Sequence, residues 1–139
     1  MKMIETYRGV VYPHHIDHMG HMNVQWYVAK FDQAAWHMMA ACGITVEHMQ
    51  ANNRGMATLE QTIRYKAEVV SGDLLLIKSR VNSITDKVIK ARHIMYNATS
   101  MQEVANMDLT AVHLDTKLRK STKFSKDTVQ RCVELFDLS

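Results

Sequence analysis

The chain has 139 residues, of which 47% are hydrophobic and 22% charged, and its formal net charge is +3. This length predicts a single domain over residues 1–139, large enough to bury a core. The modest positive charge comes without a pattern of stacking aromatic residues, which argues against a nucleic-acid partner, and no apolar stretch is long enough to cross a membrane.

The cysteines and the N-terminus indicate the cellular environment. Cys42 and Cys132 lie far apart, each in an apolar helical stretch, which predicts buried free thiols in a reducing compartment. Residues 1–5 lack the apolar segment of a signal peptide. We therefore expect a cytoplasmic protein.

The first half of the chain predicts one strand and two helices. Residues 6–12 are rich in β-branched and aromatic residues and stop at Pro13, which predicts a strand. Residues 14–22 follow a proline and contain Gly20, so no regular helix is expected there. A long helix is predicted from its N-cap Asn23 to a stop at Gly43, and a short one over 45–52. Apolar residues on most sides of the long helix predict that it is buried nearly all round.

The second half changes to the alternating pattern that is typical of strands. Strands are predicted over 56–70, 74–84, 88–97 and 104–114, and the short turns between them imply an antiparallel meander. A last helix is predicted from its N-cap Ser125. The predicted class is α+β, an antiparallel sheet wrapped around a long central helix. Because such a sheet leaves edges exposed, we expect a homo-oligomer, either a dimer or a dimer of dimers.

The turn before the long helix carries the most specific motif, Asp17-His18-Met19-Gly20-His21-Met22-Asn23. In this position the motif resembles that of hotdog-fold acyl-CoA thioesterases of the 4-hydroxybenzoyl-CoA thioesterase type, and the likeness runs roughly over residues 7–114. The resemblance implies the hotdog fold, hydrolysis of an acyl-CoA without a cofactor, and Asp17 as the catalytic aspartate. A closer likeness, carried by residues 17–32, 54–57 and 60–61, is to thioesterases associated with carnitine breakdown, which implies betainyl-CoA as a substrate.

The chemistry of a thioester gives the same junction a role. Hydrolysis needs a group that polarises the carbonyl oxygen and a carboxylate or water that attacks the carbon. We expect the first N–H groups of the helix, at Asn23, Val24 and Gln25, to form the oxyanion site. Asp17 is then either a general base for water or a nucleophile.

Side chains near Asp17 are expected to assist this chemistry. His21 and Asn23 are candidates to orient the water or the thioester, and His18 to protonate the departing thiolate. The competing roles are a helix cap for Asn23 and ordinary loop positions for the histidines. Four histidines and Asp17 within eight residues also suggest a metal site, but Pro13 denies them a common helix face, so we expect no metal.

Substrate-binding residues are predicted from charge and aromaticity. If the acyl group carries a quaternary ammonium, an aromatic cage would bind it, and Glu60 is a candidate for a carboxylate that faces it. The candidate rings are Trp26, Tyr27 and Trp36 on or near the helix and Tyr12 and Tyr65 on strands. The competing roles are core packing for the rings and solvent exposure for Glu60. Lys87 and Lys90 are the candidates to bind the CoA phosphates.

Three functions compete on this fold. An acyl-CoA thioester hydrolase is favoured because Asp17 accompanies a plausible oxyanion site. A hydratase or dehydratase relies on a histidine and an acid on the helix, whereas here the acid precedes the helix. The third is a non-catalytic acyl-CoA binding module, which the fold permits.

Overall fold

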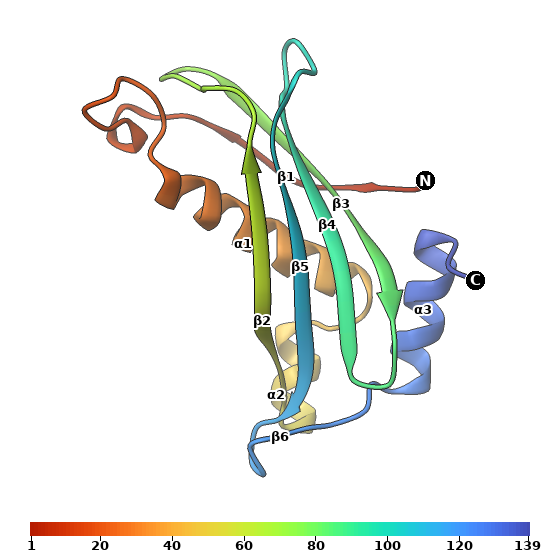
Figure 1. The fold of residues 1–139 in the computed structure, drawn as a ribbon. Helices are drawn as coiled ribbons and strands as arrows, with labels where there is room; N and C mark the ends of the chain where they lie inside the picture. Colours follow the sequence, from red (N-terminus) through yellow and green to blue (C-terminus); the bar gives the residue numbers. More distant parts are fainter.

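A computed structural model describes residues 1–139. One antiparallel sheet has the strand order β1-β3-β4-β5-β2, and a two-residue strand, β6, pairs with β5. The sheet curls, and the long helix α1 crosses one of its faces (Figure 1). In chain order the elements are β1 (Ile4–Val10), η1 (Pro13–His15), α1 (Val24–Ala41), α2 (Val46–Asn52), β2 (Arg54–Tyr65), β3 (Leu74–Ile84), β4 (Val88–Asn97), β5 (Glu103–Asp115), β6 (Lys120–Ser121) and α3 (Lys126–Phe136).

Helix α1 begins and ends where the sequence predicts. The side chain of Asn23 accepts a hydrogen bond from the Gln25 N–H, and Gly43 follows the helix with a φ of 85°. Phe31, Ala34 and Met38 are fully buried beneath the sheet. The expectation that the helix is buried nearly all round is wrong for a single chain, because Trp36 is 55% exposed.

Strands β3 and β4 have the predicted bounds, whereas β2 is shorter than predicted. It ends at Tyr65, since the Lys66 and Ala67 N–H groups both turn to the Val104 carbonyl. Val69 instead accepts a hydrogen bond from the Met22 N–H and so ties the segment after β2 to the motif before α1.

The N-terminal region also differs in detail from the prediction. Strand β1 starts and ends two residues earlier, and Pro13 opens a short 3-10 helix where an irregular segment was expected. The two-residue β6 is too short to leave a periodic signal.

Helix α3 confirms its predicted start, because the Ser125 side chain accepts from the Thr128 N–H. It packs against β3 and brings Cys132 to Cys42, with the two sulfur atoms 3.3 Å apart. Both cysteines are free thiols and fully buried, as predicted. None of the helices combines the length and the apolar composition needed to cross a membrane.

Candidate active site

The motif Asp17–Asn23 forms a tight turn that leads into α1. The Asp17 N–H donates to the His21 carbonyl, and the Gly20 N–H donates back to the Asp17 carbonyl. Gly20 has a φ of 85°, a left-handed conformation that glycine adopts without a steric penalty. Asp17 therefore lies one short loop away from the start of the helix.

Asp17 is held as a carboxylate by two hydrogen bonds. The Asn23 amide donates to Oδ2 at 2.8 Å and the Met19 N–H donates to Oδ1 at 2.9 Å. These bonds lower the pKa of Asp17 below its ordinary value, with the Asn23 bond the larger cause. The lowered pKa keeps the acid ionised at neutral pH, and the side chain is only partly buried, so it is reachable from solvent.

Only one of the three expected oxyanion donors is free. The Asn23 N–H donates to the His15 carbonyl, and the Gln25 N–H donates to the Asn23 side chain. Both are occupied because the turn folds back on the helix and because Asn23 caps it. The Val24 N–H, at the first position of α1, has no acceptor within the chain and points out at the positive end of the helix dipole.

A groove of about 260 Å³ opens beside the free N–H of Val24. Asp17 does not line this groove, but its N–H is hydrogen-bonded to His21, which does, and its carboxylate is hydrogen-bonded to Asn23, the residue before Val24. The lining residues come from the start of α1 and from the end of β2 with the segment after it: His21, Met22, Val24, Tyr27, Tyr65, Lys66, Ala67 and Glu68.

Two of the candidate rings are on different sides of α1. Tyr27 is buried in the groove wall and its ring meets that of Tyr65 edge to face, with centroids 5.1 Å apart. Trp26 instead packs against His14 and His15, at 5.6 and 4.6 Å between centroids. Of the candidate rings, Tyr27 therefore meets Tyr65 and not Trp26, because consecutive helix residues point about 100° apart.

The histidines of the motif have separate surroundings. His15 is buried and its Nδ1 accepts from the Tyr12 N–H, while His18 is exposed. His21 turns to the groove, with its Nε2 3.7 Å from the Glu68 carboxylate. Of these histidines, only His21 lines the groove that begins at Val24.

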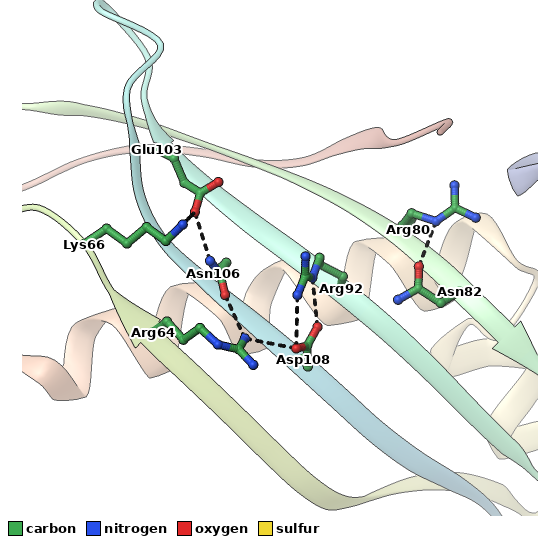
Figure 2. A network of polar contacts seen from close by, with 8 residues as sticks. All are labelled: Arg64, Lys66, Arg80, Asn82, Arg92, Glu103, Asn106 and Asp108. Atoms are coloured by element: carbon green, nitrogen blue, oxygen red, sulfur yellow. Dashed lines mark hydrogen bonds and ion pairs between the residues drawn. The ribbon is translucent and has the colours of Figure 1, made fainter.

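Glu60 is on the opposite face of the sheet from α1, so of its two expected positions it has the exposed one and does not face the pocket. The strand pairing shifts between Thr58 and Glu60, and Glu60 lies opposite Thr110. The same face carries a network in which Arg92 and Arg64 both bond Asp108, at 2.9 and 3.0 Å (Figure 2). Glu60 is on the same face as this network and therefore faces away from the groove.

The two lysines predicted to bind phosphate are also remote from Asp17 in one chain. Lys87 is in the turn between β3 and β4, and Lys90 lies exposed three residues later on β4. That turn is at the end of the sheet beside α3, whereas residues 13–22 lie at the other end (Figure 1). A role for Lys87 and Lys90 in binding CoA stays a prediction.

A second groove lies further along α1. It has a volume of about 160 Å³ and a mostly apolar wall from α1, α2, β2 and β5. Its lining includes three methionines, Met39, Met49 and Met56, with Asp32 and Trp36 at exposed positions. Methionines adapt to irregular apolar ligands, so this groove suits a hydrocarbon. Its signal in the sequence is methionines shared among three elements, which only the fold brings together.

Comparison with known proteins identifies the family. A model of the thioesterase-like superfamily matches residues 11–132, which is most of the chain and includes the whole Asp17–Asn23 motif. The chain belongs to the thioesterase-like superfamily. Betainyl-CoA thioesterase of Pseudomonas aeruginosa is 23% identical over 130 residues, covering 94% of this chain and 82% of that protein.

Solved structures of other proteins have the same fold. A Staphylococcus aureus protein in complex with CoA superposes with a TM-score of 0.91 at 15% identity, covering 100% of this chain and 88% of the other. The 1,4-dihydroxy-2-naphthoyl-CoA thioesterase of Synechocystis gives 0.81 at 15% identity, covering 93% and 95%. The predicted hotdog fold is confirmed.

Proposed function

We propose that this protein hydrolyses an acyl-CoA thioester and releases a carboxylic acid and free CoA. The observation that carries the proposal is the pairing of the ionised Asp17 with the unoccupied Val24 N–H across the capping residue Asn23. An anionic attacking group and a positive helix end are the two things a thioester carbonyl needs. The family and the CoA-bound structural relative support the same substrate class.

The Val24 N–H acts on the carbonyl oxygen. As the bond to sulfur breaks, negative charge collects on that oxygen, and a preorganised donor of this kind is worth about 3 kcal/mol in the transition state. The helix dipole adds to this without any rearrangement, since the N–H is fixed by the first turn of α1.

Asp17 acts on the carbonyl carbon by one of two routes. As a general base it takes a proton from water, which adds to the carbon and expels the CoA thiolate. As a nucleophile it forms a mixed anhydride and expels the thiolate, and water then cleaves the anhydride and restores the carboxylate. In both routes His21 is placed in the groove to orient the water or the thioester.

We further propose betainyl-CoA as the substrate and a homodimer as the working unit. The Pseudomonas aeruginosa relative supports the substrate. The dimer is supported by β2, an edge strand that has β5 on one side only and is exposed along most of its length. A second copy against this edge would cover both grooves, which open between α1 and β2.

The test is Asp17→Asn with betainyl-CoA and a free-thiol readout. Loss of the carboxylate is expected to lower kcat by about 10²- to 10⁴-fold while the fold remains, as judged by circular dichroism. Asp86→Asn, the same change at an exposed turn, is the matched control and is expected to retain full activity. Near-normal kcat in Asp17→Asn would reject the assigned role, and a wild-type protein that binds but never cleaves acyl-CoA would indicate a binding module.

A further inference from the structure

The groove beside Val24 has an aromatic wall that a single sequence motif does not reveal. Tyr27 comes from the first turn of α1 and Tyr65 from the end of β2, and their rings meet at an interplanar angle of 87°. The Tyr27 hydroxyl donates to the Ala67 carbonyl at 3.3 Å, which fixes its ring. Tyr65 is 46% exposed, so part of its ring is open to the groove.

The charge in this groove is negative. Glu68 lies in its lining with a side chain that is 75% exposed, and no lysine or arginine pairs with it; its Oε1 lies 3.7 Å from the His21 Nε2. Lys66 also lines the groove, but its ammonium is 2.8 Å from Glu103 and is neutralised there (Figure 2). A positively charged group in the groove would thus meet two aromatic rings and a carboxylate that no lysine or arginine neutralises.

We propose that Tyr27, Tyr65 and Glu68 form a subsite that selects acyl groups with a quaternary ammonium next to the thioester carbonyl. This inference depends on the proposed hydrolysis of acyl-CoA. Aromatic faces attract such a cation, which has no N–H and so gains nothing from hydrogen-bond acceptors. The Glu68 carboxylate adds a longer-range attraction that a neutral acyl group does not feel.

Distance along α1 distinguishes this subsite from the other groove. In a betainyl group the nitrogen is bonded to the carbon next to the carbonyl, so it lies about 2.5 Å from the carbonyl carbon, by standard bond lengths and angles. Tyr27 is three residues after Val24, about 4.5 Å along the helix axis. Asp32 and Trp36, the other carboxylate and ring on α1, are about 12 and 18 Å from Val24 along the helix axis, too far to contact that nitrogen.

The remaining aromatic cluster is unsuited to the same role. Trp26 is packed by the imidazoles of His14 and His15, and none of its ring partners is a carboxylate. Glu60 is on the other face of the sheet. The groove at Val24 is the place where rings, a carboxylate and the free N–H occur together.

The test compares betainyl-CoA with 3,3-dimethylbutanoyl-CoA, which has the same shape but a neutral carbon in place of the nitrogen. The measured quantity is the ratio of kcat/KM for the two substrates. In the wild type the ratio is expected to favour betainyl-CoA at least about tenfold, from the rings, the carboxylate and the inductive activation of the carbonyl by the ammonium. The inductive part is the same in every variant, so the change of the ratio on substitution measures the subsite. Glu68→Gln is expected to lower the ratio about three- to fivefold, and Tyr65→Leu by about two- to fivefold.

Two variants serve as controls for the ratio. Tyr65→Phe keeps the aromatic face and is expected to keep the wild-type ratio. Glu60→Gln makes the same charge change on the opposite face of the sheet and is expected to leave the ratio and the activity unchanged.

The outcomes separate this subsite from the proposed function. A wild type that cleaves both substrates equally well, or a Glu68→Gln variant with an unchanged ratio, overturns the subsite and leaves the hydrolase intact. Cleavage of apolar long-chain acyl-CoA but of neither short substrate overturns it also, and assigns the acyl group to the groove at Met39 and Met56. Failure to cleave any acyl-CoA overturns the proposed function itself.

Discussion

Asn23 serves two partners with one side chain. Its carbonyl oxygen accepts from the Gln25 N–H and caps α1, while its NH₂ group donates to Asp17. Asparagine can do both because its side-chain amide has an acceptor oxygen and a separate donor NH₂ group. Serine and threonine have a single hydroxyl, and aspartate has no donor. The cap and the catalytic acid are therefore positioned by the same group.

The variant Asn23→Asp separates these two roles. It keeps the capping oxygen, so α1 is expected to retain its stability, but it replaces the donor with a second carboxylate and so raises the pKa of Asp17. Because Asp17 acts as the ionised form, the acidic limb of kcat/KM should move to higher pH than in the wild type. The measurement is the pH profile of kcat/KM, with the melting temperature as the control. An unmoved acidic limb would show that Asp17 is not the group that titrates.

His93 is a buried imidazole whose ionisation opposes folding. It is fully buried, its Nδ1 bonds the Ser79 hydroxyl, and its Nε2 has no partner. Burial lowers the pKa of His93 to about 4. The unfolded chain, with an ordinary histidine pKa near 6.5, then binds a proton that the folded chain does not.

The stability contributed by neutral His93 is thus present above about pH 6.5 and is lost as the pH falls toward 4. The expected loss from this residue is about 3 kcal/mol in the free energy of unfolding, from 1.36 kcal/mol per pKa unit. Denaturant titrations at several pH values measure it. His93→Gln should flatten the pH dependence relative to the wild type, whereas His37→Gln, at an exposed position of α1, should not.

At the scale of elements, β1 is joined to α1 through a buried ammonium. Lys30 is 4% exposed, and its Nζ donates to the Tyr7 hydroxyl at 2.9 Å. The Tyr7 side chain reaches it by crossing over Gly9, where a Cβ would lie 2.1 Å from the tyrosine oxygen. Gly9 is therefore required by the space that Tyr7 occupies.

Gly9→Ala is expected to displace the Tyr7 hydroxyl and leave Lys30 without its partner. A buried group that loses its hydrogen bond costs about 1 to 3 kcal/mol, so the free energy of unfolding should fall by that amount. In a Tyr7→Leu background the same glycine change should cost much less, because the hydroxyl is already gone. Equal costs in the two backgrounds would show that Gly9 acts through the strand alone.

The elements that the sequence predicted correctly are those set by local signals. Asn23 and Gly43 bound α1 through capping and a left-handed φ, and the turns around β3 and β4 are short and polar. The pairing of Tyr27 with Tyr65 could not be predicted, because it depends on where β2 ends in space relative to α1.

One extra residue in β2 explains why Glu60 does not face the pocket. Simple alternation from Met56 and Thr58, which face α1, would put Glu60 on the same face. The bulge between Thr58 and Glu60 adds one unpaired residue, Leu59, and moves every later residue of β2 to the other face. No local pattern in the sequence marks this bulge.

At the scale of the whole molecule, one side of the chain exposes an unpaired strand edge together with apolar side chains. Strand β2 is an edge, Leu59 on it is 62% exposed, and Val24 and Trp36 of α1 are 54% and 55% exposed. Unpaired strand edges with apolar side chains invite another strand, and both grooves open along this side. The opposite edge, β1, is shorter and is covered by α1. A second copy set against β2 and α1 would bury these side chains and enclose the Val24 N–H away from water.

Sedimentation equilibrium is expected to show a dimer as the smallest species. Leu59→Lys is expected to dissociate this dimer, since two lysines would then oppose each other near the symmetry axis. Leu118→Lys, a change of the same kind at a 69% exposed position in the turn between β5 and β6, should remain dimeric. Because the grooves would lie open in the monomer, Leu59→Lys should also lose most thioesterase activity while retaining its circular dichroism spectrum. A fully active monomer would place the complete reaction within one chain, and β2 would then be an edge protected by its charged and polar residues alone.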